Sequence, residues 1–418
     1  MSRTFTGFGF GPIQSGLFLY EAWKSGNFGR YVVAEVDAAI VKAVRDNGGA
    51  YVVNIAHRNG IEQARLEGIE IYNPADALDR ERLLEAIAEA DELATALPSV
   101  RFYDMGAETS VVRLLAEGLK RRSSSKPAIL YAAENNNHAA EVLTESLAKL
   151  LPAAALANFE VLNTVIGKMS GVITDADTMT ALGLAPATPS LGRAVLVEEF
   201  NRILVSRPTL SGFRRGIGVF AEKADLLPFE EAKLYGHNAI HATIAYLADL
   251  KGLRTVADAA AHADIMQTAR AAFIDESGAA LIKRHAALGD PLFTPDGYRA
   301  FAEDLLERMV NPYLNDLIER VTRDPIRKLG YEDRLYGTMR IALEQGIEPR
   351  NLAKGASAAL ISMIRRQAED VRSRELPLPS DTSGLTRESA AAILHAIWRK
   401  KADEQAPRLI DLTWQAFG

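Results

Sequence analysis

Hydrophobic and polar residues follow two different spacings in the first half of the chain. Apolar runs such as RYVVAEVD at 30–37 and AILYAAEN at 128–135 have the composition of buried strands. Between them, DRERLLEAIAEADELATAL at 79–97 repeats apolar residues every three or four positions, which predicts a helix. VRFYDMG at 100–106 then looks like another short strand. Alternation of this kind indicates parallel βαβ units.

From about residue 195 onward, strand signals nearly vanish and helical spacing dominates. The segments 255–288, 295–310 and 351–370 all have helical periodicity. The pattern therefore predicts an N-terminal α/β domain at 1–190 and a mainly α-helical domain at 191–418.

Composition narrows the class of protein. The chain has 418 residues, of which 48% are hydrophobic and 24% charged, with a net charge of −6 and no cysteine. These values exclude disulfides and thiolate chemistry, and they argue against a general nucleic-acid binder. We see no transmembrane run and no signal peptide. We expect a cytoplasmic enzyme or binding protein without membrane or nucleic-acid partners, as a monomer or weak homo-oligomer.

Glycines mark the turn between the first strand and the first helix. Gly9, Gly11 and Gly16 would let backbone amides approach a pyrophosphate at the positive end of that helix. The usual spacing would place the third glycine at position 14, which is Gln14. A plain glycine-rich turn is the alternative, but the strand before it and the helix after it favour a dinucleotide site.

Two acids follow the second strand. Glu35 ends this strand, where a carboxylate can accept hydrogen bonds from the adenosine ribose. The same charge repels a ribose phosphate, so the sequence favours NAD over NADP. The alternative for Glu35 is a solvated strand end, and Asp37 is expected to cap the following helix.

A polar cluster interrupts the apolar segment KLYGHNAIHATIAYL at 233–247. On a helix of about 100° per residue, Lys233, His237, Asn238 and His241 fall within a sector of roughly 140°. The rest of the surface is mostly apolar, which is typical of a buried helix. The polar sector is therefore expected to face a cleft.

Three interpretations of this cluster stay open on residue chemistry alone. His237 and His241 have the i, i+4 spacing of metal ligands, but no HExxH glutamate accompanies them. The cluster could also be a polar helix face with satisfied core histidines. The third interpretation is carbonyl–alcohol redox chemistry, in which a buried lysine acts as general base and a nicotinamide carries the hydride.

The motifs resemble those of a known family. Lys233, Asn238 and His241 match the K-x4-N-x2-H motif of the long-chain polyol (mannitol) dehydrogenases, and the chain is most similar to their mannitol-1-phosphate 5-dehydrogenase branch. The resemblance extends over nearly the whole chain. It implies a Rossmann-like domain followed by a helical substrate domain. The matching stretches are GFGPIQSG at 9–16, VAEVD at 33–37, AAEN at 132–135, DESGAALIKR at 275–284, NPYLNDLIERVTRDPIRKL at 311–329 and DRL at 333–335.

The resemblance also implies roles for individual residues. Lys233 would be the general base, and Asn238 and His241 would polarise the carbonyl. His237 lies outside the motif and is expected to pack the helix or support its neighbours. Asn163 would contact substrate. The residues that would bind the cofactor are Gly9, Gly11, Pro12, Ile13, Gly16, Glu35 and Asn135.

The chain departs from the family near the expected substrate pocket. Gly167 and Lys168 replace an acid and an arginine, and Ser206 stands where relatives often carry an aspartate. The exact sugar alcohol is therefore open.

A basic cluster later in the chain would suit a phosphate. Asp324 and Pro325 look like a helix N-cap and first helical position. A solvated basic face is the alternative. The basic residues are Arg320, Arg323, Arg327 and Lys328, of which we take the last three as candidate phosphate ligands.

These patterns lead to one expected function and two alternatives. We expect an NAD-dependent, metal-independent oxidoreductase that interconverts a polyol and its ketose, with mannitol 1-phosphate and fructose 6-phosphate as the leading pair. One alternative is a relative acting on an unphosphorylated polyol or a sugar acid. The other is a nucleotide-binding sensor that has lost catalysis.

Overall fold

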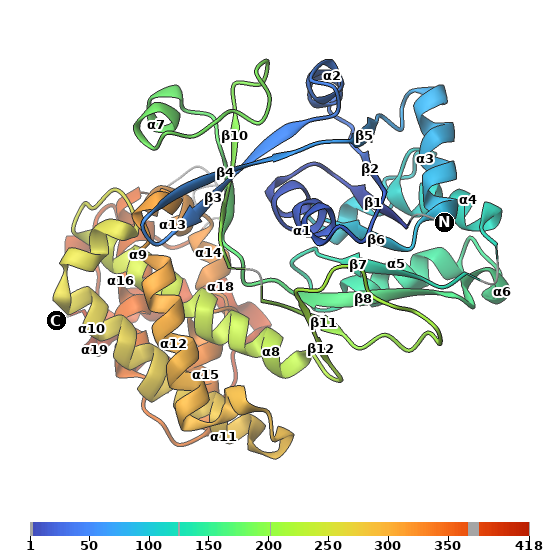
Figure 1. Cartoon of the computed structure of the whole chain (residues 1–418). Coiled ribbons are helices and arrows are strands. Elements are labelled where there is room, and N and C mark those ends of the chain that lie inside the picture. The colour runs from blue at the N-terminus through green and yellow to red at the C-terminus, as the bar shows by residue number, and fades with distance from the viewer. Residues whose placement is uncertain (1–2, 124–125, 201, 367–375, 418) are drawn as a thin grey trace. The chain divides into compact units, whose positions relative to one another are not determined.

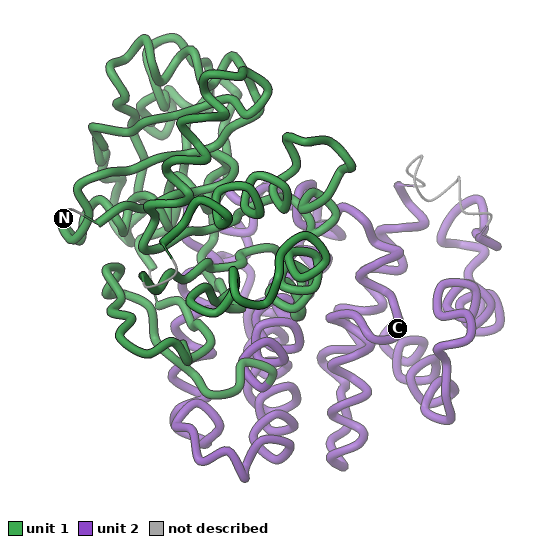
Figure 2. Tube along the Cα trace, turned by 90° about the vertical axis from the view of Figure 1, so that its right-hand side faces the viewer, with its two compact units in different colours: residues 1–227 green, residues 228–418 purple. Residues whose placement is uncertain are grey.

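The computed structural model describes residues 3–123, 126–200, 202–366 and 376–417 (Figure 1). The chain divides into two compact units, Met1–Leu227 and Pro228–Gly418 (Figure 2). This division lies later than the expected boundary near residue 190, because strands within 194–223 pair with strands of the first unit. Among the described residues, no helix is long and apolar enough to cross a membrane.

The first unit is built on an eight-stranded sheet. Six of its strands form a parallel block, because their apolar runs are covered on both faces. The strands are β1 (Thr4–Phe8), β2 (Arg30–Ala34), β5 (Ile69–Tyr72), β6 (Glu92–Thr95), β7 (Ala128–Ala132), β8 (Phe159–Val165), β11 (Ile203–Ser206) and β12 (Phe220–Lys223).

The order of these strands places a crevice next to β1. The sheet runs β12-β11-β8-β7-β6-β1-β2-β5, with β11 antiparallel to β8. From β1 the chain moves to β2 on one side and later returns to β6 on the other, so the winding reverses at β1. Parallel strands end at one edge, and ligands of such sheets bind at the reversal point.

A smaller four-stranded sheet packs within the same unit. It consists of β3 (Tyr51–His57), β4 (Gly60–Leu66), β9 (Ser170–Ile173) and β10 (Ala194–Glu198), in the order β4-β3-β10-β9. β3 and β4 form a hairpin, whereas β10 joins β3 in parallel from far along the chain.

The first helical segment fills the space between the two sheets. Phe18 and Leu19 share a core with Phe5 of the large sheet and with Val53 and Val195 of the small one. Helices after the later strands cover the other face of the large sheet. The helices of this unit are η1 (Gln14–Phe18), α1 (Leu19–Ser25), α2 (Ala38–Asp46), α3 (Ala77–Glu89), η2 (Val100–Phe102), α4 (Val111–Arg121), α5 (Ala139–Ala148), α6 (Ala153–Leu156) and α7 (Ala176–Ala181).

One predicted helix was too long, and one predicted strand was wrong. The expected helix at 79–97 stops at Glu89, and the strand β6 follows at Glu92–Thr95. The charge of Glu92 hid this strand, but its buried carboxylate accepts hydrogen bonds from Arg3 at 2.7 Å and from the Tyr131 hydroxyl at 2.9 Å. The expected strand at 100–106 instead contains the 3-10 turn η2.

The second unit is helical, as predicted. The expected helix at 351–370 is described as far as Arg366, and 367–370 lie outside the described residues. Its helices are α8 (Leu227–Glu231), η3 (Ala232–His237), α9 (Asn238–Leu250), η4 (Ala257–Ala261), α10 (Ala263–Ala271), η5 (Ala272–Gly278), α11 (Ala279–His285), η6 (Ala286–Leu288), η7 (Pro291–Phe293), α12 (Pro295–Met309), η8 (Pro312–Leu314), α13 (Ile318–Thr322), α14 (Pro325–Lys328), α15 (Tyr336–Glu344), α16 (Arg350–Arg366), η9 (Thr382–Gly384), α18 (Arg387–Trp398), η10 (Arg399–Lys401) and α19 (Ala406–Gln415).

Close packing and a buried carboxylate fix α9 and α16 in this unit. At Gly355 of α16, an added Cβ would come within 2.4 Å of Thr243 Oγ1 on α9. The buried Glu276 accepts hydrogen bonds from the backbone N–H groups of Asn351 and Leu352, at 2.7 and 2.8 Å. These bonds satisfy free amides at the start of α16. The DESG segment therefore has a structural role in this fold.

Three described helical segments, η1, η3 and η5, are π-helical. Such turns carry hydrogen bonds from residue i+5 to residue i, are rare, and occur frequently at functional sites. η1 follows the glycine-rich turn, and η3 contains Lys233. Both predicted sites thus lie at irregular turns that a 3.6-residue periodicity does not describe.

Candidate active site

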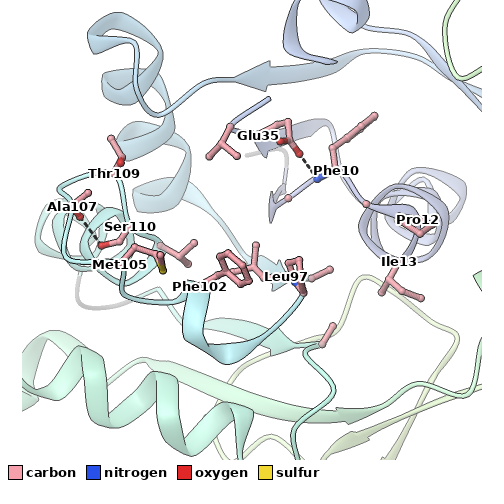
Figure 3. A pocket seen from close by; sticks show the side chains of 17 residues that line it. Phe10, Pro12, Ile13, Glu35, Leu97, Phe102, Met105, Ala107, Thr109 and Ser110 are labelled. Carbon is pink, nitrogen blue, oxygen red and sulfur yellow. Dashed lines mark hydrogen bonds between the residues drawn. The ribbon is translucent and has the colours of Figure 1, made fainter. Parts of the chain in front are cut away.

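A cavity of about 590 Å³ opens at the carboxyl ends of β1, β2, β6 and β7 in the first unit (Figure 3). Its volume is within the range of small-molecule sites. The glycine-rich turn forms one wall, and the segments after β2, β6 and β7 form the others. The lining residues are Gly9, Phe10, Gly11, Pro12, Ile13, Glu35, Val36, Ala96, Leu97, Pro98, Phe102, Met105, Ala107, Thr109, Ser110, Val111 and Ala133.

The three glycines have different physical reasons to be glycine. Gly9 has a φ of +85°, which side chains rarely adopt. An added Cβ at Gly16 would come within 2.4 Å of Val197 Cγ1, so this glycine allows η1 to pack on β10. Gly11 has neither constraint, since an added Cβ would meet open space. No residue that the structure describes requires glycine there, whereas a phosphate approaching the turn would.

Glu35 connects the end of β2 to the glycine-rich turn. Its Oε2 accepts a hydrogen bond from the backbone N–H of Phe10 at 2.7 Å, and its Oε1 accepts one from Asp37 at 2.8 Å. Figure 3 shows the first of these bonds as a dashed line between Glu35 and Phe10. A carboxylate has about four acceptor positions. Glu35 can therefore hold the turn and still accept hydrogen bonds from a ribose.

The lysine of the second unit lies in the π-helical turn η3. Burial lowers the pKa of Lys233 to about 8; the nearby Glu230 carboxylate raises it and the Arg334 guanidinium lowers it. A lysine with this pKa is partly unprotonated near neutral pH. It can therefore accept a proton, which an ordinary surface lysine does poorly.

The π-helical turn determines which side chains share a face with Lys233. The backbone N–H of Asn238 donates to the carbonyl of Lys233, five residues earlier. This bond widens the turn, so Asn238 lies nearer in direction to Lys233 than it would in a regular α-helix. His241 follows Asn238 by three residues and continues the same face.

Two histidines on this helix differ in surroundings. Burial lowers the pKa of His237 well below its usual range, so its ring is neutral. Its ring centroid lies 6.2 Å from that of His241. His241 Nε2 lies 2.8 Å from Asp316 Oδ2, a close polar contact without the alignment of a full hydrogen bond. Electrostatic interactions with neighbouring groups lower the pKa of His237 further, namely with His241, Arg308, Lys233 and Arg334.

Comparison with known proteins places the chain in a family. A mannitol-1-phosphate 5-dehydrogenase of Bacillus licheniformis is 30% identical over 388 residues, which cover 91% of this chain and 93% of that protein. One of Shouchella clausii is 33% identical over 278 residues, covering 66% and 68% of the two chains. The family model for the mannitol dehydrogenase C-terminal domain matches residues 225–397.

The chain belongs to the mannitol dehydrogenase family. It is an oxidoreductase.

Solved structures with this fold include two polyol dehydrogenases. D-sorbitol dehydrogenase in substrate-free form has a TM-score of 0.75 at 15% identity and covers 99% of this chain and 92% of that chain. Mannitol 2-dehydrogenase of Pseudomonas fluorescens, in ternary complex with NAD and D-mannitol, has a TM-score of 0.69 at 16% identity, with 100% and 92% covered. The predicted fold, a parallel-sheet domain followed by a helical domain, is confirmed.

The cavity includes most of the predicted cofactor residues of this mannitol dehydrogenase family member. Gly9, Gly11, Pro12, Ile13 and Glu35 line it. Gly16 packs η1 against β10 instead, and Asn135 is exposed outside the lining. Asp37 caps α2 as expected, accepting from Ala39 N at 2.9 Å.

The predicted substrate residues are not all in positions suited to that role. Asn163 Oδ1 accepts from Ala140 N and its Nδ2 donates to Glu141, both at 2.8 Å, so its amide satisfies the start of α5. Lys168, which stands where the family usually has an arginine, donates to the carbonyl oxygens of Glu198 and Phe200. These bonds hold its loop at the end of β10.

The basic cluster of the second unit contains one buried and several exposed cations. Burial lowers the pKa of Lys328 to about 8, and its ammonium donates to the Arg323 carbonyl. Arg323 and Arg327 are exposed. Asp324 stands at the N-cap position of α14 as predicted, but its side chain does not cap; it accepts from Arg327 at 2.6 Å. The cations are thus partly neutralised by the protein itself.

Three polar residues near these sites have roles that the sequence motifs do not predict. Glu134, directly after β7, accepts hydrogen bonds from Thr95, Leu97 and Tyr103, and thereby holds a wall of the cavity. An acid at the end of a fully apolar strand could have indicated it. Arg334 lies in the DRL stretch and influences Lys233 electrostatically. No local sequence pattern indicated a role for Asp316, because it reaches His241 only in the folded protein.

No group of three or more His, Asp or Glu side chains is placed to hold a metal ion within the described part of the chain. Metal independence remains a prediction.

Proposed function

We propose that this oxidoreductase is an NAD-dependent polyol dehydrogenase with Lys233 as general base. The single observation that carries the proposal is the half-buried Lys233, whose pKa is lowered to about 8. It shares one helix face with an amide and an imidazole. These are the groups that alcohol oxidation needs: a proton acceptor and donors to the reacting oxygen.

The chemistry divides between proton and hydride. In the oxidative direction, the neutral amine of Lys233 takes the proton of the reacting hydroxyl. When bound, NAD supplies the acceptor for the hydride that leaves the carbinol carbon. Asn238 and His241 orient the oxygen and stabilise its developing negative charge. In the reductive direction, Lys233 returns the proton to the oxygen of the ketose.

The cavity of the first unit supports NAD as the cofactor. Gly11 leaves the open space that a pyrophosphate would fill, and Glu35 places a carboxylate at the ribose position. The described lining residues include no lysine or arginine that could pair with a 2′-phosphate. An NADP phosphate would therefore meet one negative charge and no positive one.

A phosphorylated substrate is the finer part of the proposal. The relatives that cover most of this chain are named mannitol-1-phosphate 5-dehydrogenases. Lys328 and Arg334 add positive charge in the same unit as Lys233. The two lie close to each other, because the charge of Arg334 helps to lower the pKa of Lys328. Cations of this kind favour a phosphate monoester. Mannitol 1-phosphate and fructose 6-phosphate are the proposed pair.

An unphosphorylated polyol is the second candidate. Arg327 is engaged by Asp324 at 2.6 Å and lies 3.6 Å from Asp333. An arginine paired with two carboxylates in this way has little charge left to bind a phosphate. The ion pairs of Arg327 therefore favour an unphosphorylated substrate, and this argument applies to Arg327 only.

The test is NADH oxidation over matched pairs of ketoses and ketose phosphates. We expect kcat/KM for fructose 6-phosphate to exceed that for fructose by at least about a hundredfold, since a charge-assisted phosphate site contributes roughly 3 kcal/mol. A higher value for the free sugar would select the second candidate. No turnover with any ketose, together with tight NADH binding, would instead indicate a sensor.

A further inference from the structure

The contact between His241 and Asp316 determines how the imidazole can act. Asp316 lies between η8 and α13, with 6% of its surface exposed, and its Oδ2 is 2.8 Å from His241 Nε2. Its other oxygen, Oδ1, accepts from Arg320 Nη2 at 2.5 Å and from Nε at 3.1 Å. The Asp316 carboxylate thus lies between two basic side chains, His241 and Arg320.

The backbone holds Asp316 in place independently of these side chains. Its carbonyl oxygen accepts from Val256 N at 2.9 Å, and Leu317 bridges to Thr255. Asn315, just before it, adopts a left-handed conformation with a φ of +46°. The carboxylate therefore approaches the histidine from a fixed loop and not from a freely rotating surface side chain.

Asp316 is ionised in this setting. Burial alone would raise its pKa, but the contact with His241 and the charge of Arg320 outweigh burial and hold the pKa of Asp316 below its usual value. An ionised carboxylate can only accept hydrogen bonds.

The charged side chains with the strongest influence on His237 are positive. Those that influence His237, and so lie around the same two rings, are Lys233 of η3, Arg308 of α12 and Arg334 before α15. Arg320 of α13 faces Asp316. Asp316 is thus the negative group in direct contact with the His241 ring.

We infer that Asp316 is a positioning residue that keeps a hydrogen on Nε2 of His241 and so directs Nδ1 to the substrate oxygen. This inference rests on the proposed role of Lys233, Asn238 and His241. A ring nitrogen beside an acceptor-only group carries the hydrogen. Nδ1 makes no hydrogen bond within the described part of the chain. It donates to a carbonyl oxygen only when the ring is cationic and otherwise accepts from a hydroxyl.

This arrangement gives His241 a role in both directions. As a neutral ring, Nδ1 can accept the hydrogen of a second substrate hydroxyl and orient a polyol. As an imidazolium, it donates to the oxygen on which negative charge develops. A carboxamide in place of Asp316 would donate its N–H group to Nε2 and move the hydrogen of the neutral ring to Nδ1, so that Nδ1 could no longer accept from a substrate hydroxyl.

The experiment measures the tautomer directly. In the full-length protein with 15N-labelled histidine, long-range 1H–15N correlation spectra report which ring nitrogen carries hydrogen. The signals of His241 are assigned with His241→Gln. At a pH where the ring is neutral, we expect hydrogen on Nε2 in the parent protein and on Nδ1 in Asp316→Asn. Hydrogen on Nδ1 in the parent, or the same tautomer in both proteins, would overturn the inference.

Kinetics supply the second readout. Asp316→Asn is expected to lower kcat/KM for polyol oxidation about tenfold, because Nδ1 can no longer accept a hydrogen bond from a substrate hydroxyl, with NADH affinity unchanged. Asp249→Asn is the matched control: it removes a partly buried carboxylate on the same helix, where it binds Arg366 and Ser362. Full activity of Asp316→Asn would overturn the inference. An active Lys233→Ala would refute the proposed function instead, and the tautomer measurement would still stand.

Discussion

Asn238 donates its backbone N–H to the carbonyl oxygen of Lys233 across a π-helical turn. In a regular α-helix, residues five apart would point in clearly different directions. The wider turn brings their directions closer together, so we expect the lysine and the amide to meet the same substrate oxygen. We therefore expect Lys233→Ala to lower kcat by at least about a hundredfold, the usual contribution of a positioned acid–base group. Steady-state assays with unchanged thermal unfolding check this, and retention of most activity would contradict it.

The pH dependence of activity should report the environment of Lys233. The residue accepts a proton only when unprotonated, so kcat/KM for polyol oxidation should rise about tenfold per pH unit up to its pKa. That pKa is about 8, so the profile should level off above this value.

Arg334→Gln should move this profile in a known direction. The positive charge of Arg334 lowers the pKa of Lys233, so its removal should raise that pKa and shift the rising limb to higher pH. Arg340→Gln is the control, because Arg340 lies in the same region but pairs with Asp403. A shift of equal size in both variants would show that the effect is not specific to Arg334.

The sequence predicted the fold class well and the boundary poorly, for one physical reason. Strands such as β1 and β2 follow each other along the chain, and their alternation with helices reveals parallel pairing. β10 pairs with β3 from far away, and no local pattern encodes such a partner. The same limitation explains Asp316, which reaches His241 only through tertiary folding. The π-helical turn could not be predicted either, because a helical projection assumes 3.6 residues per turn throughout.

Substitutions at two glycines of the first turn should have different effects, one on stability and the other on NAD binding. Gly16→Ala should destabilise the protein by about 1–3 kcal/mol, because the new Cβ overlaps Val197. Gly11→Ala should leave the free energy of unfolding nearly unchanged, since its Cβ meets open space. It should nevertheless weaken NAD binding at least about tenfold by obstructing the phosphates. Denaturant unfolding and NAD titration distinguish the two, and unaffected NAD binding in Gly11→Ala would place the phosphates elsewhere.

Glu35 should determine the choice of cofactor. We expect NAD to exceed NADP by more than about tenfold in kcat/KM, because charge-assisted hydrogen bonds to the ribose contribute about 1.5–3 kcal/mol. Glu35→Ser should shrink this preference, mainly by weakening NAD. Asp37→Ser is the control, since it removes the neighbouring charge and keeps a residue able to cap α2. Equal kcat/KM for both cofactors in the parent would show that Glu35 does not face the ribose.

Removal of metal ions should not affect activity. Lys233 supplies the proton transfer in the proposed mechanism, so no step requires a Lewis acid. Activity should survive exhaustive dialysis against a chelator. Loss of activity that zinc restores would instead support metal binding by His237 and His241.

The bond from Phe10 to Glu35 also constrains how such an enzyme can evolve. Any substitution that removes the carboxylate releases the glycine-rich turn at the same time. Under the proposed role of Glu35, a change to NADP would need a cation for the phosphate and also a new acceptor for the Phe10 N–H group. One carboxylate would then link the choice of cofactor to the conformation of the glycine-rich turn.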